Sequence, residues 1–196
     1  MTKPLPALSL RNDAIAPFQT MELVKSAQAL EASGHSIIHM SIGEPDFTAT
    51  PSVIEALNRA LAQGKSQYTP ALGIAPLREA IATHYLRTEA LEVDPACVIV
   101  TAGASAALTL ACLALVNPGD EVLLTDPSYP CNRHFVAAAN GIAKTIPVGP
   151  ETRYQLNAEL IRKHWSPSTR GVLLASPAKD RKSTRLNSSH EWISRM

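Results

Sequence analysis

VIVTAGASAALTLACLALVNPGDEVLLTDPSY, residues 98–129, carries the pattern that decides the fold. The β-branched run at 98–101 predicts a strand, and the small-residue turn Gly103-Ala104-Ser105 opens an apolar helix that stops at residues 117–119. A second apolar run at 122–125 predicts another strand. The order strand, helix, strand is a β-α-β unit of an α/β fold. Its first turn aims backbone N–H groups outward, so we expect it to hold an anion.

The remaining elements are predicted on both sides of this unit. Residues 1–19 are punctuated by proline and lack a period, which favours an arm or loop. Turn formers at 67–73 predict a loop that presents Tyr68 at a surface. The apolar spacing predicts helices at 21–33, 51–63, 74–85, 130–140 and 156–165, and strands at 37–42, 141–148 and 171–175.

Composition excludes several classes of protein. The 196 residues hold 18 basic and 17 acidic side chains, with no long block of one charge before residue 179, which argues against nucleic-acid or acidic-membrane binding. Three cysteines without paired spacing favour a reducing, cytoplasmic setting. The run at 102–116 is shorter than the roughly 18 residues of a membrane span. The six histidines form no metal-ligand pattern, so no metal site is predicted.

The last eighteen residues, 179–196, break with the rest of the sequence. They are rich in serine, arginine and lysine and show no hydrophobic period. We interpret this segment as a non-homologous tail of translated non-native sequence, with a natural disordered tail as the alternative. The expected organisation is an N-terminal arm at 1–19, one domain at 20–178 and this tail.

The turn at Gly103 allows three interpretations. It differs by one residue from the G-x-S-x-G turn that presents a hydrolase nucleophile, which would make Ser105 that nucleophile. Asp126 and His164 are then the loosely placed partners. The same turn also suits a phosphate, because its small residues admit the anion and the helix dipole attracts it. A plain turn at the start of a core helix is the third interpretation, and this motif alone does not decide.

Five motifs in order carry a family resemblance. They are IGEPDF at 42–47, QYTPALGIAPLREAIA at 67–82, TAGASAAL at 101–108, NPGDEVLLTDPSYP at 117–130 and LLASPA at 173–178. Over residues 10–178 the chain resembles class I/II aminotransferases, which are pyridoxal-phosphate enzymes of fold type I. The resemblance implies an α/β large domain, here incomplete, with a mostly parallel sheet covered by helices on both faces and an N-terminal arm.

The resemblance also implies roles for individual residues toward pyridoxal 5′-phosphate. Gly103, Ala104 and Ser105 match the phosphate-binding turn. Tyr129 matches the aromatic residue that stacks on the cofactor ring. Tyr68 matches the tyrosine that reaches the phosphate of the neighbouring subunit in a homodimer.

One further match and several departures limit the resemblance. Gly43 matches the glycine beside the substrate carboxylate, where a missing side chain leaves room. After Ala178 the family continues Asn-Pro-Thr-Gly, whereas this chain has Lys179 and Asp180. The family's pyridine-binding aspartate, Schiff-base lysine and carboxylate-binding arginine have no counterpart. Lys179 and Lys182 lie too early in the sequence to serve as that lysine, so no catalytic residue is assigned.

The sequence therefore predicts part of a pyridoxal-phosphate-dependent aminotransferase. Such an enzyme transfers an amino group between an amino acid and a 2-oxo acid, and the full-length form is expected to be a homodimer. Without the lysine we expect this chain to be inactive alone. The alternatives are an inert or binding-only polypeptide and, less favoured, a serine hydrolase using Ser105.

Overall fold

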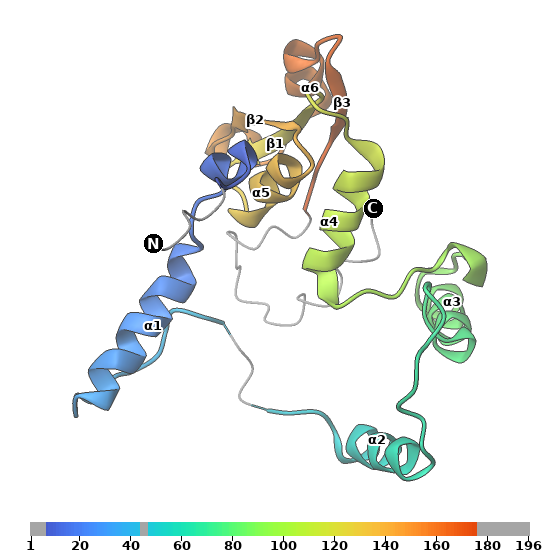
Figure 1. Ribbon diagram of the computed structural model, residues 1–196. Coiled ribbons are helices and arrows are strands. Elements are labelled where there is room, and N and C mark those ends of the chain that lie inside the picture. Colours follow the sequence, from blue (N-terminus) through green and yellow to red (C-terminus); the bar gives the residue numbers. More distant parts are fainter. Residues whose placement is uncertain (1–6, 44–46, 176–196) are drawn as a thin grey trace. The chain divides into compact units, whose positions relative to one another are not determined.

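The computed structural model describes residues 7–43 and 47–175 of the chain (Figure 1). The chain divides into two compact units, one formed by residues 1–19 and 102–196 and the other by residues 20–101. Each is described by itself. In chain order the elements are η1 (Leu10–Ala14), α1 (Gln19–Ala32), α2 (Pro51–Ala62), α3 (Ala75–Glu89), η2 (Pro95–Cys97), α4 (Gly103–Leu115), β1 (Glu121–Asp126), α5 (Cys131–Ala138), β2 (Ile142–Pro147), η3 (Pro150–Thr152), α6 (Ala158–His164) and β3 (Thr169–Val172).

The first unit is built on a parallel sheet of three strands in the order β2-β1-β3. Strand β1 is central, and its burial on both faces agrees with its apolar run Val122-Leu123-Leu124. It pairs with β2 in unbroken register from Glu121 opposite Ile142 to Asp126 opposite Pro147. The pairing with β3 is shorter and shifts in register next to Glu121.

One face of the sheet packs against α4 and α5. Val122 and Leu124 of β1 form a buried cluster with Cys112 of α4 and with Val136 and Ala139 at the end of α5. Leu124 and Val136 are completely buried. These contacts bury α4 at Cys112, whereas Leu110, Leu113 and Leu115 of the same helix remain exposed.

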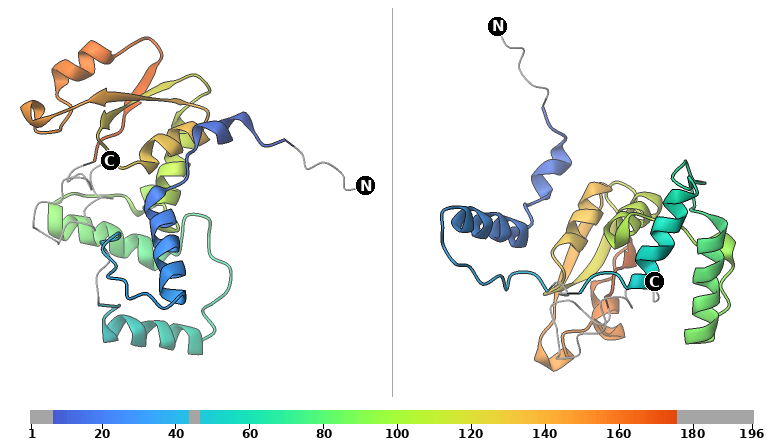
Figure 2. Two further views of the ribbon diagram at one scale, coloured as in Figure 1. Left: turned by 90° about the vertical axis from the view of Figure 1, so that its left-hand side faces the viewer. Right: turned by 90° about the horizontal axis from the view of Figure 1, so that it is seen from below.

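The opposite face is covered as well. Leu123 and Ile146 are 0% and 1% exposed, although their side chains point away from α4 and α5. Parallel strands are joined by right-handed crossovers, and the chain moves from β1 to β2 and then back past β1 to β3. The crossover helices α5 and α6 therefore lie on opposite faces, as Figure 2 shows. The predicted α/β architecture with helices on both faces is confirmed.

A polar cluster joins the beginnings of the three strands. The Glu121 carboxylate of β1 accepts hydrogen bonds from Lys144 Nζ of β2 at 2.8 Å, Ser166 Oγ at 2.7 Å and Thr169 Oγ1 of β3 at 3.3 Å. The hydrogen bonds from Lys144 and Ser166, with the lysine charge, lower the pKa of Glu121. The cluster therefore stabilises the fold above the ordinary carboxyl pKa, and this contribution is lost as the pH falls through the lowered pKa.

Replacing Glu121 should reduce the pH dependence of stability. We expect the urea midpoint of the unchanged protein to fall between pH 5 and pH 3, and Glu121→Gln to be less stable at pH 7 but to lose less over that interval. Urea unfolding at several pH values measures both effects. The matched control is Glu89→Gln, which changes an exposed glutamate at the end of α3. Equal pH profiles for Glu121→Gln and the unchanged protein would contradict the role given to the cluster.

The second unit is held together around α3. Arg78 of α3 donates from Nε to the Val98 carbonyl oxygen at 3.0 Å and from Nη2 to the Pro95 carbonyl oxygen. The Val100 N–H donates to the Leu72 carbonyl oxygen at 3.0 Å. At Gly73, where φ is +97°, an added Cβ would lie 2.6 Å from Val100 Cγ2, so glycine is required there.

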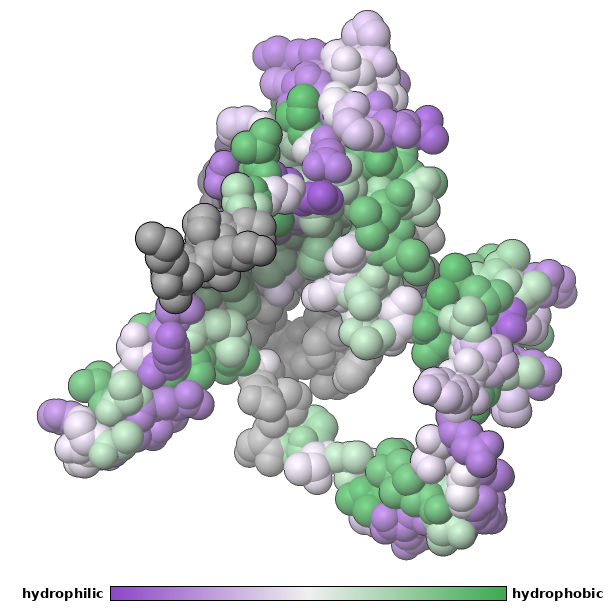
Figure 3. All heavy atoms as spheres, in the orientation of Figure 1, coloured by the Kyte–Doolittle hydropathy of each residue, from purple (hydrophilic) through white to green (hydrophobic). Residues whose placement is uncertain are grey.

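Apolar side chains of this unit remain exposed. Helix α2 carries Val53, Ile54, Leu57 and Leu61 at helical spacing, each 45–57% exposed, and Figure 3 shows the hydrophobic surface on this helix. Helix α2 has no buried residue. The predicted apolar face is therefore present, and it is not covered within the described unit.

Two predicted strands are wrong. Residues 37–42 and 98–101 have no regular secondary structure. A strand needs a neighbour for its backbone groups, and Val100 hydrogen-bonds to Leu72 in a loop instead. The other predicted elements are present with shifted ends: the helix expected at 156–165 covers Ala158–His164, and the strand expected at 171–175 covers Thr169–Val172.

In the described ranges no helix is long and apolar enough to cross a membrane.

Candidate cofactor site

The N-terminus of α4 carries the turn that the sequence predicts as an anion site. Gly103 has φ +81°, and a Cβ built there would meet no atom within 4 Å. The N-cap residue is Ala102, and no side chain caps the helix. Residues Gly103, Ala104 and Ser105 are all exposed. The first turn of a helix carries backbone N–H groups and a partial positive charge, which favour an anionic ligand.

The direction of α4 places this turn at the carboxyl edge of the sheet. Arg170, at the start of β3, donates from Nε to the Leu115 carbonyl oxygen at 2.9 Å. The C-terminus of α4 therefore lies at the amino edge. A helix of 13 residues is about 20 Å long, close to the span of a six-residue strand. Its N-terminus consequently lies at the edge where β1 ends, and ligands of open α/β sheets bind at this edge.

Tyr129 follows β1 at the same edge. Its side chain is half-buried, and its ring forms a T-shaped pair with Phe18, with ring centroids 5.9 Å apart and planes at 81°. Burial, with a hydrogen bond and an unfavourable charge interaction involving Cys131, raises the pKa of Tyr129 to about 12. The hydroxyl is neutral at physiological pH, so the ring can stack without bringing a negative charge near a phosphate.

The lysines of this unit's described part lie at the other edge. Lys144 of β2 is engaged by Glu121 at the beginning of β1. Lys163 is in the last turn of α6, and this helix runs back from the end of β2 to the start of β3. Neither amine can reach a ligand at the carboxyl edge. The described part of the unit therefore places a helix N-terminus and an aromatic ring at the carboxyl edge, and its described lysines lie at the other edge.

The hydrolase interpretation of Ser105 finds no support in this geometry. His164 is the last residue of α6 and so lies at the amino edge, whereas Ser105 lies at the carboxyl edge. Asp126, at the end of β1, is exposed. The structure does not bring the required histidine to the serine, and a serine without its base is a poor nucleophile.

Tyr68 and Gly43 belong to the other unit. The Tyr68 side chain is fully exposed on the loop before α3, as the sequence predicts. Gly43 is exposed at the end of an irregular segment. Glu44 to Asp46 and the segment 176–196, which includes Lys179 and Lys182, lie outside the described residues. Among residues 7–43 and 47–175, no group of three potential metal ligands occurs.

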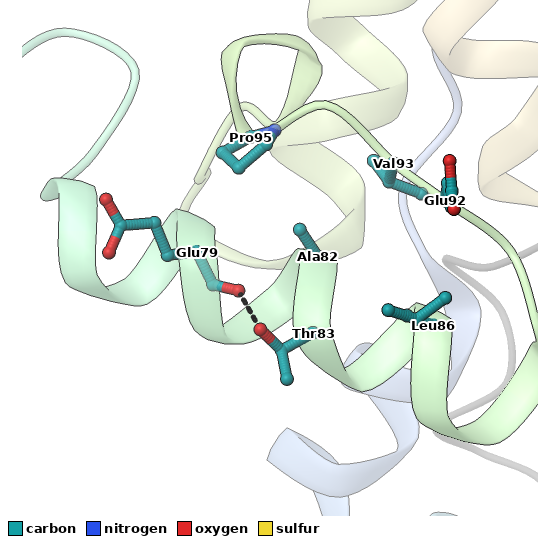
Figure 4. Close-up of a pocket in the computed structure, with 7 residues that line it drawn as sticks. All are labelled: Glu79, Ala82, Thr83, Leu86, Glu92, Val93 and Pro95. Carbon is teal, nitrogen blue, oxygen red and sulfur yellow. Dashed lines mark hydrogen bonds between the residues drawn. The ribbon is translucent and has the colours of Figure 1, made fainter.

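A separate groove lies between α3 and the segment that follows it (Figure 4). It has a volume of about 330 Å³, and its lining consists of Glu79, Ala82, Thr83, Leu86, Glu92, Val93 and Pro95. Thr83 Oγ1 donates a hydrogen bond to the Glu79 carbonyl oxygen at 2.9 Å. The groove contains no residue assigned from the sequence and no cationic group, so it does not suit a phosphate ligand.

Sequence reasoning missed the residues that support the site. Phe18 was part of an arm without periodicity, and its contact with Tyr129 joins distant positions in the chain. The sequence also did not predict the roles of Arg170 or of the residues that donate to Glu121, because single polar residues in short strands form no recognisable pattern. The available signal for Arg170 was its position. It is a basic residue at the start of a strand, where it can meet the C-terminus of a helix that packs on the sheet, and helix C-termini favour cations.

Comparison with known proteins identifies the family of the chain. The sequence profile of the family "Aminotransferase class I and II" matches residues 35–179. Valine–pyruvate aminotransferase of Mycobacterium tuberculosis is 36% identical over 164 residues, which are 84% of this chain and 42% of that protein. Aspartate/prephenate aminotransferase of Thermus thermophilus is 36% identical over 170 residues, 87% of this chain and 44% of that protein. This chain thus spans less than half the length of these relatives.

Solved structures show the same relationship. A crystal structure of an aminotransferase from Mycobacterium tuberculosis matches with a TM-score of 0.82 and 35% identity, over 89% of this chain and 45% of that chain. Aspartate aminotransferase from Thermus thermophilus with maleate matches with a TM-score of 0.81 and 35% identity, over 87% of this chain and 44% of that chain. The chain belongs to the class I and II aminotransferase family.

Proposed function

We propose that this chain carries the phosphate- and ring-binding part of a pyridoxal-phosphate-dependent aminotransferase. Members of the family use this cofactor. The observation that carries the proposal is the exposed first turn of α4, which begins at a glycine and lies at the same sheet edge as Tyr129. The reaction class is amino-group transfer between an amino acid and a 2-oxo acid.

The residues at the turn fit a phosphate. Gly103 leaves open space where a side chain would stand, and Ala104 adds only a methyl group. The Ser105 hydroxyl is exposed on the first turn of α4, from which it can donate to a phosphate oxygen. Backbone N–H groups and the helix dipole complete the recognition of a dianion.

Tyr129 fits the aromatic part of the same ligand. It can limit the tilt of a flat heteroaromatic ring by stacking, and its raised pKa keeps the side chain uncharged. When bound, pyridoxal phosphate supplies an electron sink for the electrons released as the α-proton of an amino acid leaves. What this chain contributes is the position of the phosphate and of the ring.

Proton transfer needs a base that this part of the chain does not place at the site. Lys144 and Lys163 lie at the amino edge of the sheet, and Lys144 is already paired with Glu121. The chain alone should therefore bind without catalysing. This conclusion is independent of the identity of the amino acid.

Assembly and location belong to the proposal too. Full exposure of Tyr68 leaves its ring available to a second subunit, in agreement with the role that the resemblance implies. We propose a homodimer of the full-length protein, located in the cytoplasm and acting in amino-acid biosynthesis. Gly43 is assigned to the substrate carboxylate side of the site.

Turnover measurements test the proposed division of labour. The purified chain, mixed with pyridoxal phosphate, is given aspartate or valine with 2-oxoglutarate or pyruvate, and the new amino acid is quantified by chromatography. We expect no turnover above pyridoxal phosphate without protein, because no lysine of the sheet unit's described part reaches the carboxyl edge. Protein-dependent turnover that persists in Lys144→Met and Lys163→Met would contradict the absence of a catalytic base.

A further inference from the structure

The N-terminal arm runs along α5 and is attached near both of its ends. The short helix η1 packs against α5, and Arg11 of η1 donates from Nη1 to the Ala138 carbonyl oxygen at 3.2 Å, at the last residue of α5. Seven positions later Phe18 meets the ring of Tyr129, just before the first turn of α5. The arm therefore lies antiparallel to α5, and Figures 1 and 2 show η1 beside that helix.

Both attachments have a clear physical basis. The last carbonyl groups of a helix lack partners within the helix and carry partial negative charge, so the Arg11 guanidinium satisfies one of them and favours the dipole. The Phe18–Tyr129 pair has the T-shaped geometry that aromatic quadrupoles prefer. Neither contact is strong alone, but two contacts at separate points fix the path of the arm between them.

Tyr129 lies in an irregular loop, three residues after β1 and just before α5. Phe18 adds a contact from a distant part of the chain to the restraint that the hydrogen bond with Cys131 gives the tyrosine side chain. A T-shaped pair engages at most one face of each ring, so Phe18 restrains Tyr129 and still leaves it a face for stacking.

We propose that the N-terminal arm positions the cofactor-stacking ring, with Phe18 as the positioning residue and Arg11 as its anchor on α5. This inference rests on the proposed function, since the ligand that benefits is the one assigned to Tyr129. It assigns a function to a segment whose sequence shows only proline punctuation. Phe18 acts through Tyr129 and needs no contact with the reacting atoms.

The first readout requires no ligand. In the full chain with labelled tyrosine, the ring resonance of Tyr129 is identified by its loss in Tyr129→Phe. Arg11→Met should shift or broaden this resonance, although Arg11 contacts α5 and not the tyrosine, because the arm loses its anchor. Leu10→Ala changes a neighbouring side chain of η1 that is 87% exposed and should leave the resonance in place.

The second readout is ligand affinity, measured by calorimetry with pyridoxine 5′-phosphate and with inorganic phosphate. Phe18→Leu should weaken pyridoxine 5′-phosphate by about three- to tenfold, the effect of losing one aromatic pair, and leave inorganic phosphate unchanged. Phe18→Tyr should restore most of the affinity.

The outcomes separate the two proposals. A Tyr129 resonance that is unchanged in Arg11→Met, or one that shifts equally in Leu10→Ala, overturns the role of the arm. If Phe18→Leu lowers the affinities for pyridoxine 5′-phosphate and for inorganic phosphate equally, the role of the arm is also overturned. A residue that positions the ring should have no effect on the binding of inorganic phosphate, which has no ring. Failure of the unchanged protein to bind pyridoxine 5′-phosphate refutes the proposed function, while the resonance still decides whether the arm holds Tyr129.

Discussion

Ala102→Asp is expected to stabilise the fold and to weaken phosphate binding in one step. Ala102 is the N-cap of α4 and offers no side-chain acceptor to the helix. An aspartate at an N-cap accepts from the first N–H groups and favours the dipole, which should raise the free energy of unfolding by about 1 kcal/mol. The same carboxylate takes the donors that a phosphate would use and repels it. We expect affinity for pyridoxine 5′-phosphate to fall by about tenfold or more.

The opposite signs make this substitution informative. A substitution that disrupts the fold lowers both the free energy of unfolding and the ligand affinity. An aspartate that fills the anion site should raise the free energy of unfolding and lower the affinity for the phosphate ester. Ala102→Asn is the matched control, since asparagine caps the helix without a charge and should retain part of the affinity. Urea unfolding and calorimetry on the three proteins measure both quantities. Unchanged binding by Ala102→Asp would show that phosphate does not use this helix terminus.

Leu124→Ala should lower the free energy of unfolding by about 3 kcal/mol. Leu124 is completely buried in the central strand and packs between α4 and α5 in a cluster with Val122 and Val136. Truncation removes apolar burial and leaves a cavity where three elements meet, and a parallel sheet covered on both faces has little freedom to collapse into it.

A second leucine provides the comparison. Leu113 lies on α4 but is 59% exposed, so Leu113→Ala makes the same chemical change outside the core. We expect it to alter the free energy of unfolding by less than about 0.5 kcal/mol. Urea unfolding followed by circular dichroism gives both values. Similar losses in the two variants would mean that the sheet does not form the core described here.

The parts of the fold that sequence reasoning predicted are those with repeated signals. The spacing of apolar residues predicts the helices. The apolar run at 122–125 predicts β1, because a strand that is covered on both faces of the sheet is apolar along its length. The segment at 98–101 is similarly apolar but pairs with no strand among the described residues, which shows that propensity does not supply hydrogen-bond partners.

The candidate site was predictable to the extent that it is local. The turn at Gly103 combines a positive φ with the start of a helix, and both are encoded within a few residues. The contact of Phe18 with Tyr129 and the hydrogen bond from Arg170 to α4 connect distant segments, so they follow only from the folded chain. Whether Lys144 or Lys163 could reach the candidate site could likewise be judged only once the edges of the sheet were known.

Binding of pyridoxine 5′-phosphate, compared with pyridoxine, tests the central claim most directly. Pyridoxine phosphate lacks the aldehyde and so cannot react with surface amines, which leaves only non-covalent recognition by the turn and the ring. The account predicts saturable one-site binding of the phosphate ester, at least about tenfold tighter than pyridoxine, since the phosphate makes charge-assisted hydrogen bonds at α4. Equal affinity for the two compounds, or no binding of either, would contradict it.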